Sequence, residues 1–532
     1  MLSLIALVDG RTEAFCAFVL IPSPPLFKPI QHNHSPITKL VDVLLAMKPS
    51  LSSDSEVEET TAKGIGTAHF QVPTSSSGGE FSSEPSVSPS SAPLSPVLSS
   101  PSFLFGPHRR FGDDGSLSGD QALLRLLAFG GLLFLGGLYL LHIVAICYGR
   151  YRLHRLPKQT QQIGGVRRTA LRQIQEDPLV REWPGVSVLK PLVGTDENLA
   201  ENLESFFTLD YPNMELLFCL NSGEDPAYRV VESLCAKYPS VEKRIFIGGE
   251  KVGLNPKINN MYPAYTTSRY PLFLISDQGI FMRQQALKDM VATLLEHPNV
   301  ALVTQPPYCR DRGNSFGAAL EQVYFGGAHS RIYLASHAFG FVCSTGMSAL
   351  MVKDIVEQCG GFKQFGAYLA EDYFLGQAFV KGGFRNVISH MPALQNSARP
   401  TVRSFQERIC RWIKLRIAML PHTILLEPAQ ECLVASFVGA FSVAQFFGLS
   451  AVPLFLIAHF AYWCLGDFLL LITLQNGPLP FSVVTFLLCW LFRELMAFPT
   501  FVKAVLNPHI GWRFGTYRLC WGGRIKPPPK LT

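Results

Sequence analysis

The sequence predicts an α/β protein of the membrane, with a mostly parallel sheet and flanking helices between an N-terminal transmembrane helix and C-terminal membrane helices. Hydrophobic residues make up 48% of the 532 residues and charged residues only 16%, which is unusually apolar for a soluble enzyme. Apolar runs long enough to cross a bilayer lie near both ends of the chain. Between them, strand-like and helix-like patterns alternate, as in a sheet covered by helices.

The N-terminal third contains an extension, a crossing and a linker. Ser and Pro dominate from Pro73 to Pro101, and we therefore predict a disordered extension over residues 1–120. A transmembrane helix is predicted over 121–149, because this run exceeds the roughly 20 apolar residues that a crossing needs. The basic juxtamembrane linker 150–184 follows, and its arginines and lysines place the downstream side in the cytosol.

Residues 185–405 form the predicted cytosolic catalytic domain. VSVLKPLV, MELLFCLN, RIFIGG, YPLFLISD and NVALVTQPP are strand-like, and ENLAENLESFFTL and PAYRVVESLCAKYP between them are helix-like. In open sheets of this kind, ligands bind beyond the carboxyl ends of the strands. Candidate functional residues are therefore the polar residues at these ends.

Three segments are predicted after this domain: an interfacial helix at 406–428, two to three membrane helices at 429–506 and a basic tail at 507–532. Arg493, Glu494 and Lys503 in the last apolar run indicate either a crossing or an interfacial or tilted helix. Four crossings would place the tail opposite the catalytic domain, whereas its basic charge favours the cytosolic side. Both topologies stay open.

Composition argues against structural zinc or disulfide frameworks and against nucleic-acid binding. The twelve cysteines include no CxxC pair, so neither a zinc site nor a small disulfide framework is predicted. The formal net charge is +6, without a basic stripe interleaved with aromatic residues. We therefore expect no nucleic-acid partner. The sequence makes no prediction of oligomeric state.

Three aspartates at strand ends or turns are the candidate chemical groups: Asp225, Asp277 and Asp372. Each has a structural alternative. Asp225 precedes a proline that begins a helix and can be a cap, Asp277 in SDQG can be a turn former, and Glu371 with Asp372 can complement a helix N-terminus. The basic and aromatic run RICRWIKLR, with Arg408, can likewise be a membrane-surface helix.

Together these groups suit a nucleotide-sugar transferase. Asp277 can hold a divalent metal that neutralises the leaving diphosphate, and Asp225 can hold the uridine. Asp372 can act as general base for an acceptor hydroxyl. Arginines such as Arg408 can bind the diphosphate through two hydrogen bonds each, and Trp412 can stack on a sugar or lipid.

Six stretches in register resemble the ceramide glucosyltransferases, glycosyltransferase family 21: VSVLKPLVGTDENLAENLESFF, KVGLNPKINNM, LEQVYFGGAHSR, STGMSALM, AEDYF and RICRWIKLRIAMLP. The resemblance implies a GT-A fold and an inverting transfer of glucose from UDP-glucose to the primary hydroxyl of ceramide, giving glucosylceramide and UDP. It also implies a multi-pass protein of the Golgi membrane, with the endoplasmic reticulum as the alternative, whose catalytic domain faces the cytosol.

The family's pattern of three aspartates and a final (Q/R)xxRW motif maps onto Asp225, Asp277, Asp372 and the motif residues Arg408, Arg411 and Trp412. The resemblance implies that the three motif residues, like Asp225, bind the UDP-sugar donor. Asp372 is then the base, with Glu371 as orienting or capping partner. Because the metal motif is Asp-Gln-Gly and not a full DxD, a single carboxylate ligand for Mg²⁺ or Mn²⁺ is expected.

Two further residues enter through the resemblance alone. Lys257 is similar to a donor-site lysine that meets phosphate, and its alternative is a loop lysine. His329 falls where the family has an active-site histidine, and its alternative is a structural histidine. The rival functions are a related membrane glycosyltransferase with another sugar or a polysaccharide acceptor, and a non-catalytic lipid-binding scaffold. The predicted partners are thus UDP-glucose, ceramide and the lipid bilayer.

Overall fold

The computed structural model describes residues 119–155, 183–297, 299–310, 315–341, 343–512 and 515–526. All of them belong to one unit of the fold. The predicted disordered extension lies outside these ranges except for its last two residues, as does most of the predicted linker 150–184.

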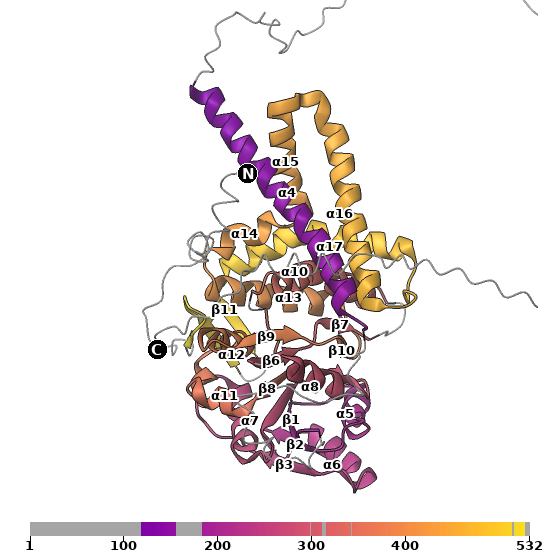
Figure 1. Cartoon of the computed structure of the whole chain (residues 1–532), viewed down its shortest axis with the longest axis vertical. Coiled ribbons are helices and arrows are strands. Elements are labelled where there is room, and N and C mark those ends of the chain that lie inside the picture. Colours follow the sequence, from indigo (N-terminus) through magenta and orange to yellow (C-terminus); the bar gives the residue numbers. More distant parts are fainter. Residues whose placement is uncertain are drawn as a thin grey trace, which may run out of the picture. The chain divides into compact units, whose positions relative to one another are not determined.

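A seven-stranded mixed sheet forms the centre of the domain that follows residue 183 (Figure 1). Its order is β3-β2-β1-β4-β8-β6-β9. The strands are β1 Val186–Leu192, β2 Met214–Leu220, β3 Lys243–Ile247, β4 Leu272–Ser276, β6 Val300–Thr304, β8 Ser348–Val352 and β9 Arg385–Ile388. Strands β3, β2, β1 and β4 are parallel, whereas β8 is antiparallel to both β4 and β6. The carboxyl ends of β1, β2 and β4 therefore share one edge, where β8 begins.

Helices pack on the sheet because their apolar faces join its core. They are α5 Leu199–Phe207, α6 Ala227–Lys237, α7 Pro256–Thr267, α8 Ala286–Glu296, α11 Lys353–Gln358 and α12 Glu371–Lys381. Leu203 and Phe206 of α5, Met261 of α7 and Met290 of α8 are buried with the strand residues. The predicted class, a mostly parallel sheet with flanking helices, is confirmed. The sequence prediction missed strand β8.

A three-stranded ribbon connects the sheet to the helical part of the molecule. Its order is β5-β10-β7, with β5 Ile280–Phe281, β7 Pro307–Cys309 and β10 Ala393–Gln395. Because β5 follows β4 by only three residues and β10 precedes the helix α13 Val402–Met419, the ribbon links that helix to the carboxyl edge of the sheet.

Part of the predicted catalytic domain packs against apolar helices instead of the sheet. These elements are α9 Phe316–Tyr324, the π-helix η1 Phe325–His329 and α10 Ser330–Ala338. They contact α4 Gly119–Arg152, α16 Val452–Gln475 and α17 Val483–Leu506. Phe325 and Leu334, for example, share a buried cluster with Trp463 of α16.

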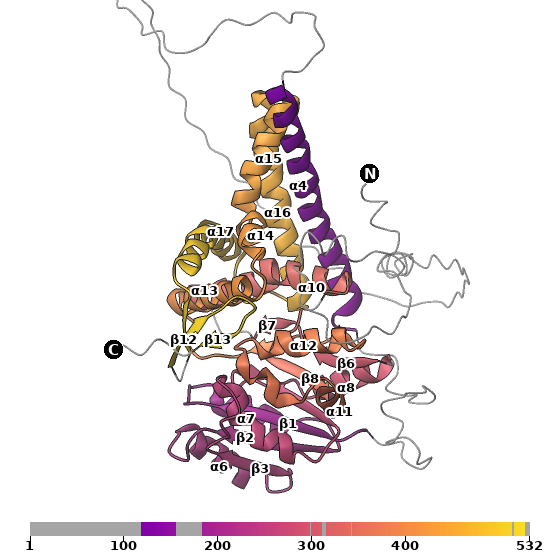
Figure 2. The same ribbon diagram turned by 90° about the vertical axis from the view of Figure 1, so that its left-hand side faces the viewer.

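Three helices are long and apolar enough to cross a membrane among the described residues: Gly119–Arg152, Leu449–Gln475 and Val483–Leu506. The bent pair α14 Thr423–Ala429 and α15 Cys432–Phe447, with 85° between them, raises the number to four if it counts as one span. Helices α4, α15 and α16 lie side by side, whereas α13 and α17 run across their direction (Figures 1 and 2).

A buried polar cluster joins the apolar helices. Asp467 of α16 is fully buried and accepts hydrogen bonds from His142 of α4 at 3.2 Å, Arg331 of α10 at 3.3 Å, and Trp490 and Arg493 of α17 at 3.0 Å each. Ionisable groups are costly among apolar helices unless they are paired. The cluster therefore favours one arrangement of α4, α10, α16 and α17.

The C-terminal tail lies against the catalytic domain. Its sheet consists of β11 His509–Trp512, β12 Gly515–Leu519 and β13 Ile525–Lys526. The Gly523 amide donates to the Ala418 carbonyl at 3.0 Å, and Arg524 forms a β-bridge with Tyr368 beside α12. The tail and the sheet domain are therefore in direct contact.

Candidate active site

Asp225 lies at the sheet edge where β1 and β2 end. Its carboxylate accepts the Gly194 amide after β1 at 2.9 and 3.0 Å and the Ala227 amide at the start of α6 at 2.9 Å. Gly194 has φ +64°, a conformation that glycine adopts without steric cost. Asp225 thus caps the start of α6, as its structural alternative predicted. It also joins the loop after β1 to the loop after β2.

Asp277 follows β4 on the same edge. Its amide donates to the Met347 carbonyl at 3.0 Å, just before β8, and its side chain is 43% exposed. The neighbouring Gln278 accepts the Val193 amide at 2.9 Å, which ties the β4 end to the β1 loop. Beneath the edge, the fully buried Lys190 donates to the Asp277 carbonyl at 2.8 Å, and burial lowers the pKa of Lys190 to about 7.

Lys257 forms ion pairs with two predicted residues that are distant in sequence, Asp277 and Glu371. Its amine lies 2.9 Å from Asp277 Oδ1, 2.9 Å from Glu371 Oε1 and 3.2 Å from the Gly346 carbonyl. Burial by itself would lower the pKa of Lys257, but the carboxylates of Asp277 and Glu371 outweigh it and raise the pKa. Lys257 is therefore held as a cation beside the exposed carboxylate of Asp277.

The start of α7 fixes the position of Lys257. Asn255 caps the helix by accepting the Lys257 amide at 2.8 Å, with Pro256 in the first helical position. The Asn255 amide group also donates to Glu371 Oε2 at 3.1 Å. Sequence reasoning missed Asn255, although Asn-Pro before an apolar periodic run is a helix-start signal that could have identified it.

Asp372, the second residue of α12, is half-buried beside this cluster. Its Oδ2 accepts the Gly346 amide and its Oδ1 accepts the Tyr373 amide at 2.8 Å. Burial and, after it, the negative charge of Glu371 raise the pKa of Asp372 to about 7. A carboxylate with such a pKa can take a proton from a hydroxyl near neutral pH.

Gly346 joins these groups and was not singled out from the sequence. A Cβ there would lie 3.1 Å from the Lys257 amine and 3.3 Å from Asp372 Oδ2. These separations are tighter than ordinary contacts, so a side chain would displace one of the two groups. Gly346 lies in STGMSALM, one of the six stretches that resemble the family, but only the pairing of β8 with β4 brings it to the site.

The RxxRW residues lie on α13 and contact α9 and η1. Arg408 donates to Gln395 at 2.9 Å and forms an ion pair with the buried Glu321. The Trp412 ring lies 5.9 Å from the His329 ring. Arg411 also lies on α13. Within the described residues, Arg408 and Trp412 therefore contact α9, η1 and β10, and neither contacts the Lys257 group.

His329 is half-buried and stacks on Tyr333 at 5.6 Å. Burial and then the nearby Arg416 lower the pKa of His329 to about 3, so its imidazole is neutral. Its Nδ1 is buried and has no hydrogen-bond partner in the part of the chain that the structure describes. The Tyr333 hydroxyl hydrogen-bonds Thr304 at 2.6 Å, and this contact connects the ring stack to the end of β6.

The raised pKa of Asp372 predicts a pH profile. A base acts as the carboxylate, whose fraction grows as the pH rises through about 7. At saturating donor, kcat/KM for the acceptor should therefore rise with pH, with a single-proton slope below about pH 7. A rate that falls through this range would point instead to Lys190, which loses its charge as the pH rises. A flat profile would contradict a role for either group.

Comparison with known proteins identifies the family of the chain. The model of Glycosyl transferase family 21 matches residues 137–525. The chain is 50% identical to ceramide glucosyltransferase 3 of Caenorhabditis elegans over 403 residues, covering 76% of this chain and 83% of the relative. Identity to ceramide glucosyltransferase 1 of the same organism is 48% over 401 residues, covering 75% and 81%. Among solved structures, a mannosyltransferase from Pyrobaculum calidifontis aligns with TM-score 0.40 and 16% identity, covering 70% of this chain and 99% of that protein.

Proposed function

Because the chain belongs to glycosyl transferase family 21, we propose that it transfers glucose from UDP-glucose to the primary hydroxyl of ceramide, with inversion, giving glucosylceramide and UDP. The structural observation that supports the proposal most is Asp372. Its pKa is raised to about 7, and it lies beside Lys257 and Asp277 at the edge of the sheet where ligands bind. Relatives named ceramide glucosyltransferases support the choice of sugar and acceptor.

The reaction is a single displacement. The acceptor hydroxyl gives its proton to the Asp372 carboxylate as its oxygen bonds to the anomeric carbon of glucose. The bond from that carbon to the β-phosphate oxygen breaks, and UDP leaves from the opposite face with the electron pair. The glucoside formed is therefore the β-anomer. Glu371, paired with Lys257 and Asn255, holds the first turn of α12 and so orients Asp372.

Lys257 is the proposed direct contact of the diphosphate, and Asp277 would meet it through a bound divalent metal ion. Among the residues that the structure describes, no group of three or more His, Cys, Asp or Glu side chains is arranged to hold a metal ion. The exposed carboxylate of Asp277 nevertheless fits Mg²⁺ or Mn²⁺, because such ions are often held by one or two carboxylates together with substrate phosphates and waters. A bound ion would neutralise charge on the leaving diphosphate.

The remaining predicted residues have supporting roles in this proposal. Asp225, held by the Gly194 loop amide and the Ala227 amide at the start of α6, would bind the uridine. Arg408, oriented by Glu321 and Gln395, and Arg411 would contact the diphosphate. Trp412 would stack on the donor, and the neutral His329 would lie beside Trp412 in the site.

We further propose that α4, α15 and α16 cross the Golgi membrane and that α17 lies along its cytosolic surface. Two crossings between the sheet domain and the tail satisfy the contact of Gly523 with Ala418. The direction of α17 across the three other helices supports the same topology. Arg150 and Arg152 at the end of α4 favour a cytosolic catalytic domain.

The test is an assay on membranes that express the chain and lack endogenous activity. Radiolabelled UDP-glucose, UDP-galactose and UDP-N-acetylglucosamine are each offered with short-chain ceramide or with diacylglycerol. We expect product only from UDP-glucose with ceramide, as the β-glucoside. Chelation should reduce the rate, and added Mg²⁺ or Mn²⁺ should restore it. A different sugar or acceptor would refute the proposed substrates, and unchanged turnover after chelation would refute the metal.

A further inference from the structure

Two consecutive residues that lead into α12 contact the tail sheet of β11, β12 and β13. Tyr368 forms an antiparallel β-bridge with Arg524. Leu369 is only 2% exposed, because it shares a buried cluster with α13 and with one residue of each tail strand: Leu415, Ala418, Ile510, Leu519 and Ile525. The tail therefore covers the entry to the helix that carries Asp372 (Figures 1 and 2).

Phe374, two residues after Asp372, extends this contact into the first turn of α12. Its ring stacks on the ring of Tyr368, with 3.8 Å between the centroids. The Phe374 ring also lies against Gly523 of the tail: a Cβ at Gly523 would be 2.7 Å from it. Carbon atoms that are not bonded to each other favour separations of about 3.5–4.0 Å. Only glycine therefore fits between the tail and this ring.

The turn that contains Gly523 is held by its own hydrogen bonds. The Cys520 amide donates to the Arg524 carbonyl at 2.9 Å, and the Gly523 amide lies 3.1 Å from the Cys520 carbonyl and 3.0 Å from the Ala418 carbonyl of α13. Gly522 and Gly523 have φ +80° and +76°, which other residues adopt only with strain. The turn is therefore fixed in one conformation and attached to α13.

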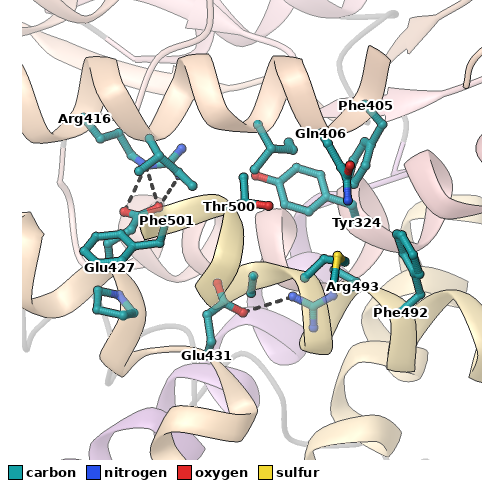
Figure 3. A pocket seen from close by; sticks show the side chains of 15 residues that line it. Tyr324, Phe405, Gln406, Arg416, Glu427, Glu431, Phe492, Arg493, Thr500 and Phe501 are labelled. Atoms are coloured by element: carbon teal, nitrogen blue, oxygen red, sulfur yellow. Dashed lines mark hydrogen bonds and ion pairs between the residues drawn. The ribbon is translucent and has the colours of Figure 1, made fainter. Parts of the chain in front are cut away.

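The end of α13 that carries the tail is itself held in place. Arg416 donates to Glu427 of α14 from Nε at 3.0 Å (Figure 3). Leu415 and Ala418, on the same part of α13, are buried with the tail. Met419 Cγ would lie 2.9 Å from a Cβ at Gly523, but methionine is a flexible side chain that adapts its shape. The stacked ring of Phe374 has no such freedom, so a side chain at Gly523 would displace the first turn of α12.

The opposite side of this turn is tied to the candidate active site. Asn255 donates to the Tyr368 carbonyl at 2.7 Å and to Glu371 Oε2 at 3.1 Å. The Ser344 hydroxyl donates to the Asp372 carbonyl at 2.7 Å. The segment from Tyr368 to Phe374 is therefore held by the sheet domain on one side and by the tail on the other. The position of Asp372 depends on both.

We propose that the C-terminal tail is a positioning element of the transferase, and that Gly523 sets the position of Asp372 through its contact with Phe374. The inference rests on the proposed function, in which Asp372 takes the proton of the acceptor hydroxyl. Gly523 takes no part in the chemistry and acts only through the first turn of α12. The tail is then needed for turnover but not for binding of the donor.

A matched pair of glycine variants of the full-length chain tests the inference in membranes. Both Gly523→Ala and Gly522→Ala place a methyl group at a positive φ, but no atom lies within 4 Å of a Cβ at Gly522. Gly523→Ala should lower kcat for glucose transfer by about ten- to hundredfold, whereas Gly522→Ala should stay within about twofold of wild type. The UDP-glucose KM should be unchanged in both. Since burial is the main cause of the raised pKa of Asp372, displacing this turn should move the acid limb of the pH profile to lower pH in Gly523→Ala alone.

A milder pair of variants applies if Gly523→Ala does not fold, as judged by thermal unfolding in detergent. Ile525→Val removes one methyl group from the cluster around Leu369 and should lower kcat by about twofold or more, with the acid limb again at lower pH. Lys526→Ala, at the exposed neighbouring residue, should match wild type.

Three results would decide against the tail as a positioning element. They are a wild-type kcat in folded Gly523→Ala, equal losses of kcat in the two glycine variants, and, where Gly523→Ala does not fold, a wild-type kcat in Ile525→Val. A wild type that does not glucosylate ceramide would instead overturn the proposed function.

Discussion

Asp372→Asn should lower kcat for glucose transfer by about 10²- to 10⁴-fold, the usual contribution of a general base. The amide of asparagine cannot take the proton of the acceptor hydroxyl. Its oxygen can still accept the Gly346 amide, so the loop before β8 should keep its place. UDP binding, measured by calorimetry on the purified protein, should be unchanged within a factor of about three, since Asp372 is not a proposed donor contact.

Glu371→Gln is the matched control, because it removes the adjacent carboxylate and preserves its size. Glu371 pairs with Lys257 and Asn255, so this variant should lose less activity than Asp372→Asn. It should also lower the pKa of Asp372 by removing a nearby negative charge, which moves the acid limb of the pH profile to lower pH. The base assignment would be wrong if Asp372→Asn stayed fully active or if Glu371→Gln lost as much activity.

Lys257→Met should give the second large effect, because the amine joins groups from three segments. Its removal leaves the buried Glu371 without its ion-pair partner, and breaking a buried pair in this way costs about 3–5 kcal/mol. The donor KM should rise as well, since a cation beside the diphosphate is lost. Loss of this positive charge should raise the pKa of Asp372 and move the acid limb to higher pH.

A double variant separates the structural role of Lys257 from its proposed contact with the donor. Lys257→Met with Glu371→Gln removes both charges of the pair and should regain most of the thermal stability. The donor KM should nevertheless stay high in the double variant. A donor KM that recovered together with stability would show that Lys257 only supports the fold. Thermal unfolding in detergent and initial rates at varied UDP-glucose supply the two readouts.

Much of the fold is predictable because its signals are local. The apolar run of α4 and its flanking arginines depend only on neighbouring residues, as do the alternating patterns that locate β1, β2 and β4. Strand β8 escaped prediction because a short apolar run does not indicate its own type or its partners. Its antiparallel pairing with β4 joins segments about 75 residues apart and brings Gly346 beside Asp277.

The sequence by itself determined the apolar segments, the α/β class, the resemblance to family 21 and the candidate residues Asp225, Asp277, Asp372 and Lys257. Only the tertiary structure decided that one amine joins Asp277 to Glu371, that Trp412 contacts His329, and that the tail lies on the catalytic domain. The periodicity of apolar residues in a segment indicates which face of that segment is buried. It does not indicate which other segment covers that face, because that depends on packing between residues distant in sequence. The charge of the tail left two topologies open. The bridge from Arg524 to Tyr368 supports the proposed one, in which the tail and the sheet domain share a side of the membrane.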